Sequence, residues 1–254
     1  MRSRLRWLLR ISIGLLALPV ARAADANRQP TFVIVHGAWG GGWAFKEVDR
    51  LLTADGNKVY RPTLTGQGER VHLSSPSINL STHITDIVNV ILWEDLHDIV
   101  LVGHSYGGMV VAGVMDRVPE RIQRVVFVDA AVPNDGESMR DTMGADFMPA
   151  DHPEDEFLIP KWLKPNPPLP HDVPQPAKTW TEPVSFKNPA AHKLPVTYIL
   201  TVDAGRPPKD DDFYRCYQRA KSRGWTTEIM EGDHNVQWSK PKELVRRLEA
   251  AARK

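Results

Sequence analysis

The chain has 254 residues, of which 42% are hydrophobic and 25% charged, and its formal net charge is +1. This length is enough for one large α/β domain with a sizeable core, and the charge gives no reason to expect a nucleic-acid partner. The single cysteine, Cys216, excludes an internal disulfide framework and a thiolate metal cluster.

The first 23 residues have the pattern of a secretory signal peptide. Three arginines within the first six residues precede a mostly apolar stretch up to Val20, and small residues flank a cleavage position after Ala23. Removal would lower the basic residues from 32 to 27 against 31 acidic ones, a net charge of −4. The alternative is an uncleaved membrane anchor, but the apolar stretch is short for a membrane span. We expect a secreted or periplasmic protein, residues 24–254, without a stable membrane anchor.

Strand and helix patterns alternate along the rest of the chain. β-Branched apolar runs predict strands, and apolar residues at helical spacing predict helices between them. The expected strands are 31–35, 58–62, 99–102, 124–129, 196–203 and 226–230, and the expected helices are 45–54, 80–96, 109–118, 211–222 and 240–252. This alternation indicates an α/β fold with a mostly parallel sheet and helices on both faces.

Residues 133–195 interrupt the alternation. The segment is rich in proline and acidic residues and carries scattered tryptophan, phenylalanine and methionine. A connection of this length is either disordered or a functional lid. Its large apolar residues favour a small cap that packs on the body.

A Gly-x-Ser-x-Gly pattern at Gly103, Ser105 and Gly107 lies between an expected strand and an expected helix. This is the context of a nucleophile elbow, in which a sharp turn exposes a serine hydroxyl at the edge of the sheet. Small residues allow the turn to close. The alternative is a glycine-rich loop with an idle serine.

A serine nucleophile needs a base, and the base needs an orienting acid. In this fold the three follow in the order Ser, Asp or Glu, His. His234 follows the last expected strand and is the predicted base. Asp203, at the end of the strand after the cap, is the preferred acid, and Asp129, at the end of the preceding strand, is the reserve.

An oxyanion hole is the third requirement. The amide of Tyr106, directly after the nucleophile, should supply one donor, and the amide of Ala38, in the loop after the first strand, should supply the second. Trp39 and Trp43 flank that loop. They line an apolar substrate pocket in one interpretation and pack in the core in the other.

Four motifs of the sequence resemble motifs of a known family. Residues 32–39 with Trp43, residues 101–108 and residues 233–241 resemble α/β-hydrolases related to plant methylesterases and hydroxynitrile lyases, and residues 65–70 look like a loop of bacterial esterase-like members. The resemblance implies an α/β-hydrolase fold and a Ser-His-Asp enzyme that uses no cofactor and no metal. It implies Ser105 as nucleophile and His234 as base, with the amides of Ala38 and Tyr106 as oxyanion hole and the acid at or beside Asp203.

Two departures from the hydroxynitrile lyases narrow the reaction. Those enzymes place a lysine directly after the histidine and a threonine in the oxyanion loop, where this chain has Asn235 and Gly37. The charge that would stabilise a leaving cyanide is therefore missing, which argues against cyanohydrin cleavage.

The sequence thus predicts a serine hydrolase that cleaves a carboxylic ester of a small molecule through an acyl-enzyme intermediate. Two alternatives stay open. One is a non-hydrolytic small-molecule binding protein on the same fold. The other is a hydrolase of a lactone, an amide or a carbon–carbon bond, because fold does not fix function. The sequence does not indicate an oligomeric state.

Overall fold

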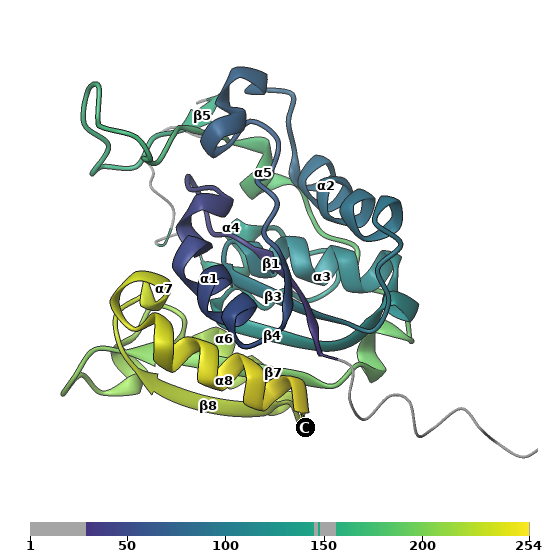
Figure 1. Ribbon diagram of the computed structural model, residues 1–254. Coiled ribbons are helices and arrows are strands. Elements are labelled where there is room, and N and C mark those ends of the chain that lie inside the picture. Colours follow the sequence, from purple (N-terminus) through teal and green to yellow (C-terminus); the bar gives the residue numbers. More distant parts are fainter. Residues whose placement is uncertain (1–28, 145–146, 148–155, 254) are drawn as a thin grey trace, which may run out of the picture.

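The computed structural model describes residues 29–144, 147 and 156–253. The predicted signal peptide lies outside these residues. A six-stranded sheet forms the centre of the described part (Figure 1). Its strands, in spatial order, are β2 (Lys58–Tyr60), β1 (Thr31–Val35), β3 (Ile99–Ser105), β4 (Ile122–Ala130), β7 (Val196–Val202) and β8 (Thr226–Glu231).

All five strand pairings in this sheet are parallel. The central strands are buried along nearly their whole length, which explains why their sequences are continuous apolar runs rather than alternating ones. The expected α/β fold with a mostly parallel sheet is confirmed.

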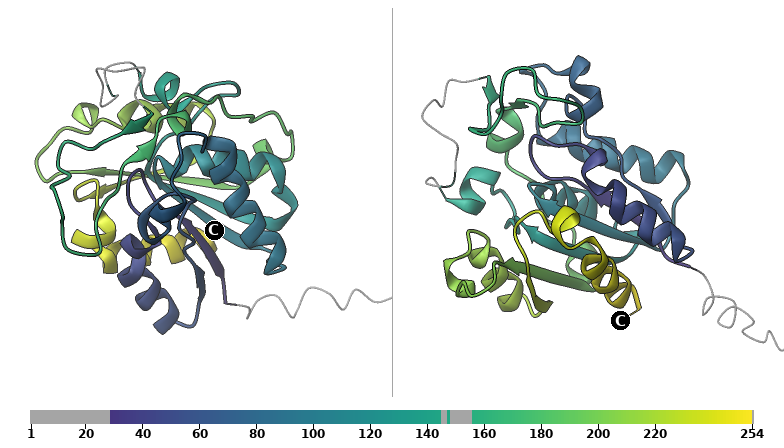
Figure 2. Two further views of the ribbon diagram at one scale, coloured as in Figure 1. Left: turned by 90° about the horizontal axis from the view of Figure 1, so that it is seen from above. Right: turned by 60° about the vertical axis from the view of Figure 1, so that its left-hand side comes forward.

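Helices cover both faces of the sheet. Helices α1 (Lys46–Ala54) and α8 (Pro241–Arg253) pack against each other on one face. Helices α2 (Leu80–Trp93), α3 (Gly107–Arg117) and α6 (Tyr214–Ser222) cover the other face (Figures 1 and 2). Two apolar cores result, one on each side of the sheet. None of the helices in the described part of the chain is long and apolar enough to cross a membrane.

Residues 133–195 are here called the cap segment, and the elements in its described part are all short. These are α4 (Met139–Met143), β5 (Phe157–Leu158), β6 (Gln175–Pro176), α5 (Lys178–Thr181) and a 3-10 turn at Ala191–Lys193, and β5 pairs with β6 in an antiparallel ribbon. The Glu182 carboxylate accepts hydrogen bonds from the backbone N–H (2.7 Å) and the hydroxyl (2.8 Å) of Ser81, in the first turn of α2. This anion offsets the partial positive charge of the helix start and anchors the cap segment to the body.

Several boundaries differ from the sequence expectation. Strand β3 continues through Ser105, and α2 ends at Trp93. A 3-10 helix occupies Gly68–Leu73, where a loop was expected. A short helix, α7 (Val236–Ser239), precedes α8 and has no apolar periodicity long enough to predict it. These differences lie at the ends of elements or in short elements, where local patterns carry little information.

Candidate active site

Ser105 is the last residue of β3 and lies in a strained turn. Its φ is +54°, in the left-handed region that side chains other than glycine rarely occupy. Gly107 makes this turn possible, because a Cβ there would lie 2.6 Å from the Val35 carbonyl oxygen. Gly37 lies against the serine, and its own Cβ would lie 3.0 Å from the Ser105 Cβ. The backbone therefore holds the hydroxyl at the carboxyl end of the sheet, as the elbow motif predicts.

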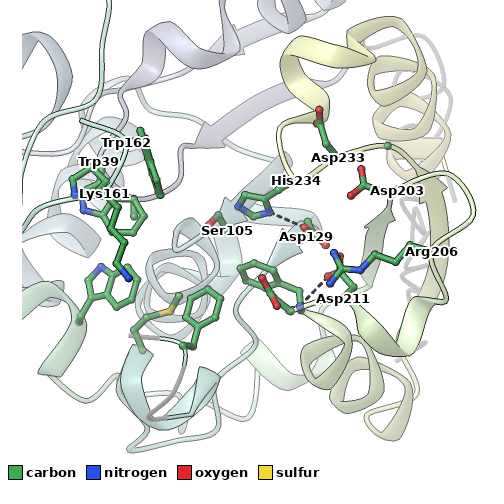
Figure 3. Close-up of a pocket in the computed structure, with 18 residues that line it drawn as sticks. Trp39, Ser105, Asp129, Lys161, Trp162, Asp203, Arg206, Asp211, Asp233 and His234 are labelled. Carbon is green, nitrogen blue, oxygen red and sulfur yellow. Dashed lines mark hydrogen bonds and ion pairs between the residues drawn. The ribbon is translucent and has the colours of Figure 1, made fainter. Parts of the chain in front are cut away.

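His234 follows β8 and lies beside Ser105 in a common cavity (Figure 3). Its Nδ1 donates a hydrogen bond to Asp129 Oδ2 at 2.6 Å. The other oxygen, Oδ1, accepts the Thr201 backbone N–H at 3.1 Å, and the Asp129 side chain is only 1% exposed. The proton on Nδ1 leaves Nε2 of the neutral ring as the acceptor, which is the tautomer that a general base requires.

The acid that contacts His234 is Asp129, not the preferred Asp203. Asp203 is exposed in the turn after β7, and its side chain makes no hydrogen bond to His234 within the described residues. Strand order does not explain this choice, because β7, which precedes Asp203, is the neighbour of β8, which precedes His234. The local backbone explains it, because Asp203 lies exposed beyond the end of β7, whereas an irregularity at the end of β4 brings Asp129 to the histidine. The expectation for Asp203 is therefore corrected to Asp129, the reserve assignment.

A bulge at the end of β4 turns Asp129 toward the histidine. His104 pairs with Val128 and Ser105 with Ala130, so Asp129 is an extra residue in the ladder, with φ +44°. The buried Tyr198 hydroxyl holds the bulge, because it donates to the Ala130 carbonyl (3.0 Å) and accepts from the Ala130 N–H (3.2 Å). The sequence did not indicate this role of Tyr198, because a tyrosine within a buried strand is expected simply to pack in the core.

Carboxylates raise the affinity of His234 for a proton. Burial opposes the charged ring, but the hydrogen bond and charge of Asp129, with the more distant charges of Asp211 and Asp212, outweigh burial and raise the pKa of His234. Burial and the charge of Asp129 also raise the pKa of Asp211 to about 6. The Phe213 ring stacks on His234 with centroids 5.0 Å apart and limits its rotation.

Two further histidines near the turn are buried and support the backbone. His104 Nε2 donates to the His234 carbonyl oxygen at 2.8 Å, which ties the nucleophile strand to the histidine loop. His36 Nδ1 donates to the Gly37 carbonyl at 2.8 Å, and its Nε2 accepts the Leu64 N–H at 3.1 Å. Burial lowers the pKa of His36 to about 4 and that of His104 to about 3, so both rings are neutral.

The two backbone amides predicted as oxyanion donors belong to segments that adjoin Ser105. Tyr106 is the N-cap of α3, so its N–H lies at the partially positive start of that helix. Ala38 belongs to the glycine-rich loop after β1 and lines the cavity beside Ser105. Within the described residues, neither the Ala38 N–H nor the Tyr106 N–H donates a hydrogen bond, so both are available to a ligand oxygen.

The cavity at Ser105, here called the first chamber, has a volume of about 490 Å³. Aromatic side chains from the oxyanion loop and the cap segment line one side of it, and carboxylates after β7 and β8 line the other (Figure 3). The lining residues used below are Trp39, Phe147, Trp162, Trp180, Asp203, Asp211, Asp212, Phe213 and Asp233. Its size is within the range of small-molecule sites.

The two tryptophans of the oxyanion loop have different positions. Trp39 lines the first chamber, and its indole N–H donates to the Leu158 carbonyl at 3.0 Å, which fixes it to the cap segment. Trp43 lies outside this chamber and stacks on Trp238, with centroids 5.7 Å apart. The core-packing interpretation therefore fits Trp43, while Trp39 contacts the site. No group of three or more His, Cys, Asp or Glu residues in the described part of the chain is arranged to hold a metal ion.

Comparison with known proteins decides the family. The model of the alpha/beta hydrolase family matches residues 32–247, most of the chain. The chain belongs to the alpha/beta hydrolase family. A carbendazim hydrolyzing esterase from Nocardioides sp. (strain SG-4G) is 49% identical over 108 residues, which are 42% of this chain and 45% of that protein. Methylesterase 2 from Arabidopsis thaliana is 34% identical over 113 residues, 44% of this chain and 43% of that protein. The matches span less than half the length of these relatives.

Two solved structures extend the likeness over most of the chain. An extracellular alpha/beta-hydrolase from a Paenibacillus species has a TM-score of 0.69 and 25% identity, and the match covers 89% of this chain and all of that one. A pyrethroid hydrolase from Sphingobium faniae has a TM-score of 0.67 at 19% identity, covering 89% of this chain and 98% of that one, a likeness of fold.

Proposed function

We propose that the protein is a serine hydrolase that cleaves carboxylic esters of small molecules through an acyl-enzyme. The observation that carries the proposal is the 2.6 Å hydrogen bond from His234 to the buried Asp129, beside Ser105 in a cavity of small-molecule size. The esterase names of two relatives support the choice of an ester bond.

In this proposal His234 Nε2 takes the Ser105 proton as the serine oxygen attacks the ester carbonyl carbon. The carbonyl oxygen becomes an oxyanion that the N–H groups of Ala38 and Tyr106 stabilise. The tetrahedral intermediate then expels the alkoxide, which receives the proton from His234. Water, deprotonated by the same histidine, attacks the acyl-enzyme and releases the acid and the free serine. Asp129 stabilises the imidazolium in both halves of the cycle.

The test uses the chain from residue 24 onward, with p-nitrophenyl esters of short and long acids and with carbendazim, which the name of the first relative suggests. Substitution Ser105→Ala should reduce ester hydrolysis by at least about 10³-fold while the variant stays folded. A folded wild type that turns over no ester would contradict the proposal. Ligand binding without turnover, or hydrolysis of lactones or amides alone, would then favour one of the alternatives.

Export is a separate part of the proposal. It depends on the signal-peptide pattern of residues 1–23, and it agrees with the name of the Paenibacillus structure, which calls that protein extracellular. We expect N-terminal sequencing of the protein from a periplasmic or secreted fraction to begin at Ala24. A protein that stays in the membrane fraction with an intact N-terminus would show the uncleaved anchor instead.

A further inference from the structure

A second cavity adjoins the Ser105 turn. This second chamber has a volume of about 480 Å³, nearly that of the first. The two chambers share five residues: Ala38, Trp39, Ser105, Trp162 and His234. The candidate nucleophile and base therefore lie at the junction of two spaces, each large enough by itself for a small-molecule substituent.

Four parts of the chain build the second chamber, and one of them is the end of β3 with His104 and Ser105. The glycine-rich loop contributes Gly40, and the start of the histidine-bearing C-terminal region contributes Gln237 and Trp238 of α7. The cap segment supplies Trp162 and Asp172. The Trp162 indole N–H donates to the Asp172 carboxylate at 2.7 Å, and the Trp162 ring meets Trp39 edge-on with centroids 5.2 Å apart. Trp162 thus forms a wall common to both chambers.

The two chambers differ in charge. The second is lined by the neutral rings of His36 and His104, and its carboxylate, Asp172, is engaged by Trp162. Beyond Asp129, the first chamber carries both signs of charge: four more carboxylates, from Asp203, Asp211, Asp212 and Asp233, and two cations, from Lys161 and Arg206. The described lining of the second chamber holds no lysine or arginine to compensate a buried anionic group, and one oxygen of its single carboxylate, Asp172, is already hydrogen-bonded to Trp162. An uncharged substituent therefore suits this chamber.

We propose that the substrate is an ester with a substantial substituent on each side of the ester bond, one in each chamber, and that the second chamber takes an uncharged group of about the size of an aromatic ring. This inference rests on the proposed function and makes it more specific. With the ester carbon at Ser105, the acyl and alcohol groups extend in opposite directions, and the structure offers a separate space for each.

Three substrates test the inference: the methyl ester of an arylacetic acid, the benzyl ester of acetic acid, and the benzyl ester of the same arylacetic acid. The two-sided ester makes apolar contacts in both chambers, whereas each one-sided ester makes them in only one. We expect its kcat/KM to exceed that of each one-sided ester by about 100-fold. Equal kcat/KM for all three esters would overturn the inference.

Gly40 provides a matched pair of variants. A Cβ at Gly40 would have its nearest neighbours, the Ala38 carbonyl oxygen and Asp172 Oδ1, at 3.8 Å, an ordinary contact distance. A side chain there would extend beside Asp172, a wall of the second chamber. Gly40→Phe should fill the chamber and lower the preference for the two-sided ester at least tenfold. Gly40→Ala, which adds one methyl group, should keep that preference within about threefold.

Trp238→Ala gives an independent measurement if Gly40→Phe does not fold. Trp238 is half exposed, so its removal enlarges the second chamber without opening the core. The variant should accept a naphthylmethyl group where the wild type prefers benzyl. Unchanged preferences in a folded Gly40→Phe and in Trp238→Ala would refute the two-chamber substrate while Ser105-dependent ester hydrolysis persists. Absence of any ester hydrolysis would instead refute the proposed function.

Discussion

Ser105 and Asp129 share an unusual backbone conformation. Both have positive φ, +54° and +44°, at the ends of neighbouring strands. Each such residue costs on the order of 1–2 kcal/mol relative to an ordinary conformation. The surrounding sheet bears this strain, through the close approach of Gly107 to β1 and through the two hydrogen bonds of Tyr198 to Ala130.

A pair of aspartate variants separates the two candidate acids. Asp129→Asn should lower kcat by about 10³–10⁴-fold, because an amide in place of the carboxylate favours the wrong histidine tautomer and cannot stabilise the imidazolium. Asp203→Asn, an exposed residue of the same cavity, should stay within about threefold of the wild type. Ester hydrolysis by both variants, with far-UV circular dichroism as the folding control, checks this. The reverse ranking would restore Asp203 as the acid.

The pH profile should report the carboxylates around His234. The base acts in its neutral form, so activity should increase with pH through a pKa above the usual value of 6.5. Asp211→Asn removes one negative charge that raises this pKa, so the rising limb should move to lower pH. Asp211 has a pKa of about 6, so more than half of it is ionised in the wild type above that pH, and there kcat/KM should increase about twofold in the variant.

Profiles of kcat/KM between pH 5 and 9, measured for both proteins, give the comparison. A limb that keeps its position in the variant would show that the Asp211 charge does not reach the histidine. A limb that moves to higher pH would contradict the sign of the effect.

At the level of elements, α3 depends on close contact with the strand beside the nucleophile. A Cβ at Gly108 would lie 2.1 Å from the Ala131 carbonyl oxygen, a backbone atom that cannot move aside cheaply. Gly108→Ala should therefore cost about 1–3 kcal/mol of unfolding free energy. It should also lower activity, because displacement of α3 moves the Tyr106 amide. Thermal and urea unfolding measure the first effect and ester hydrolysis the second, with Gly40→Ala as the sterically open control for stability.

Removal of the Tyr198 hydroxyl tests the bulge at the end of β4. Tyr198→Phe keeps the ring in the core but leaves the Ala130 N–H and carbonyl without their partner. An unsatisfied buried polar group costs about 1–3 kcal/mol, and here relaxation of the bulge would relieve it. We expect kcat to decrease about tenfold, with the KM of a small ester nearly unchanged. A variant with wild-type kcat and only reduced stability would show a purely structural role.

The sequence allowed the body elements to be predicted but not the choice of acid. Buried parallel strands leave continuous apolar runs, such as residues 31–35, and the elbow leaves fixed glycines around Ser105. Both Asp129 and Asp203 follow such strands. The choice between them depends on the bulge at Asp129, which leaves no local pattern in the sequence. The cap segment was equally indistinct, because its short helices and ribbon contain too few residues for periodicity.

On the scale of the whole molecule, three buried neutral histidines make stability depend on pH. Burial lowers the pKa of His36 and His83 to about 4 and that of His104 to about 3, below the usual 6.5. The unfolded chain therefore binds more protons than the folded protein below pH 6.5, so stability is complete above that pH and is lost as the pH falls toward 4. At pH 5 each histidine removes about 2 kcal/mol, a large share of a typical 5–15 kcal/mol.

Urea unfolding at pH 8 and pH 5 measures this loss. His83→Gln should reduce the difference between the two pH values by about 2 kcal/mol, whereas substitution of the exposed His72 by glutamine should leave it unchanged. An equal difference in both variants would place the acid sensitivity outside the buried histidines.

The all-parallel sheet also affects how the chain reaches its fold. No pairing of the central sheet is a local hairpin, and the central pairing of β1 with β3 joins Thr31 to Ile99 across the whole of α1, β2 and α2. Loop-closure entropy must be lost before any of these ladders gains its hydrogen bonds, so such topologies fold slowly. During that time the apolar strands are exposed and able to associate with other chains. The yield of native protein should therefore be set by a competition between folding and aggregation, and slower synthesis at low temperature should favour folding.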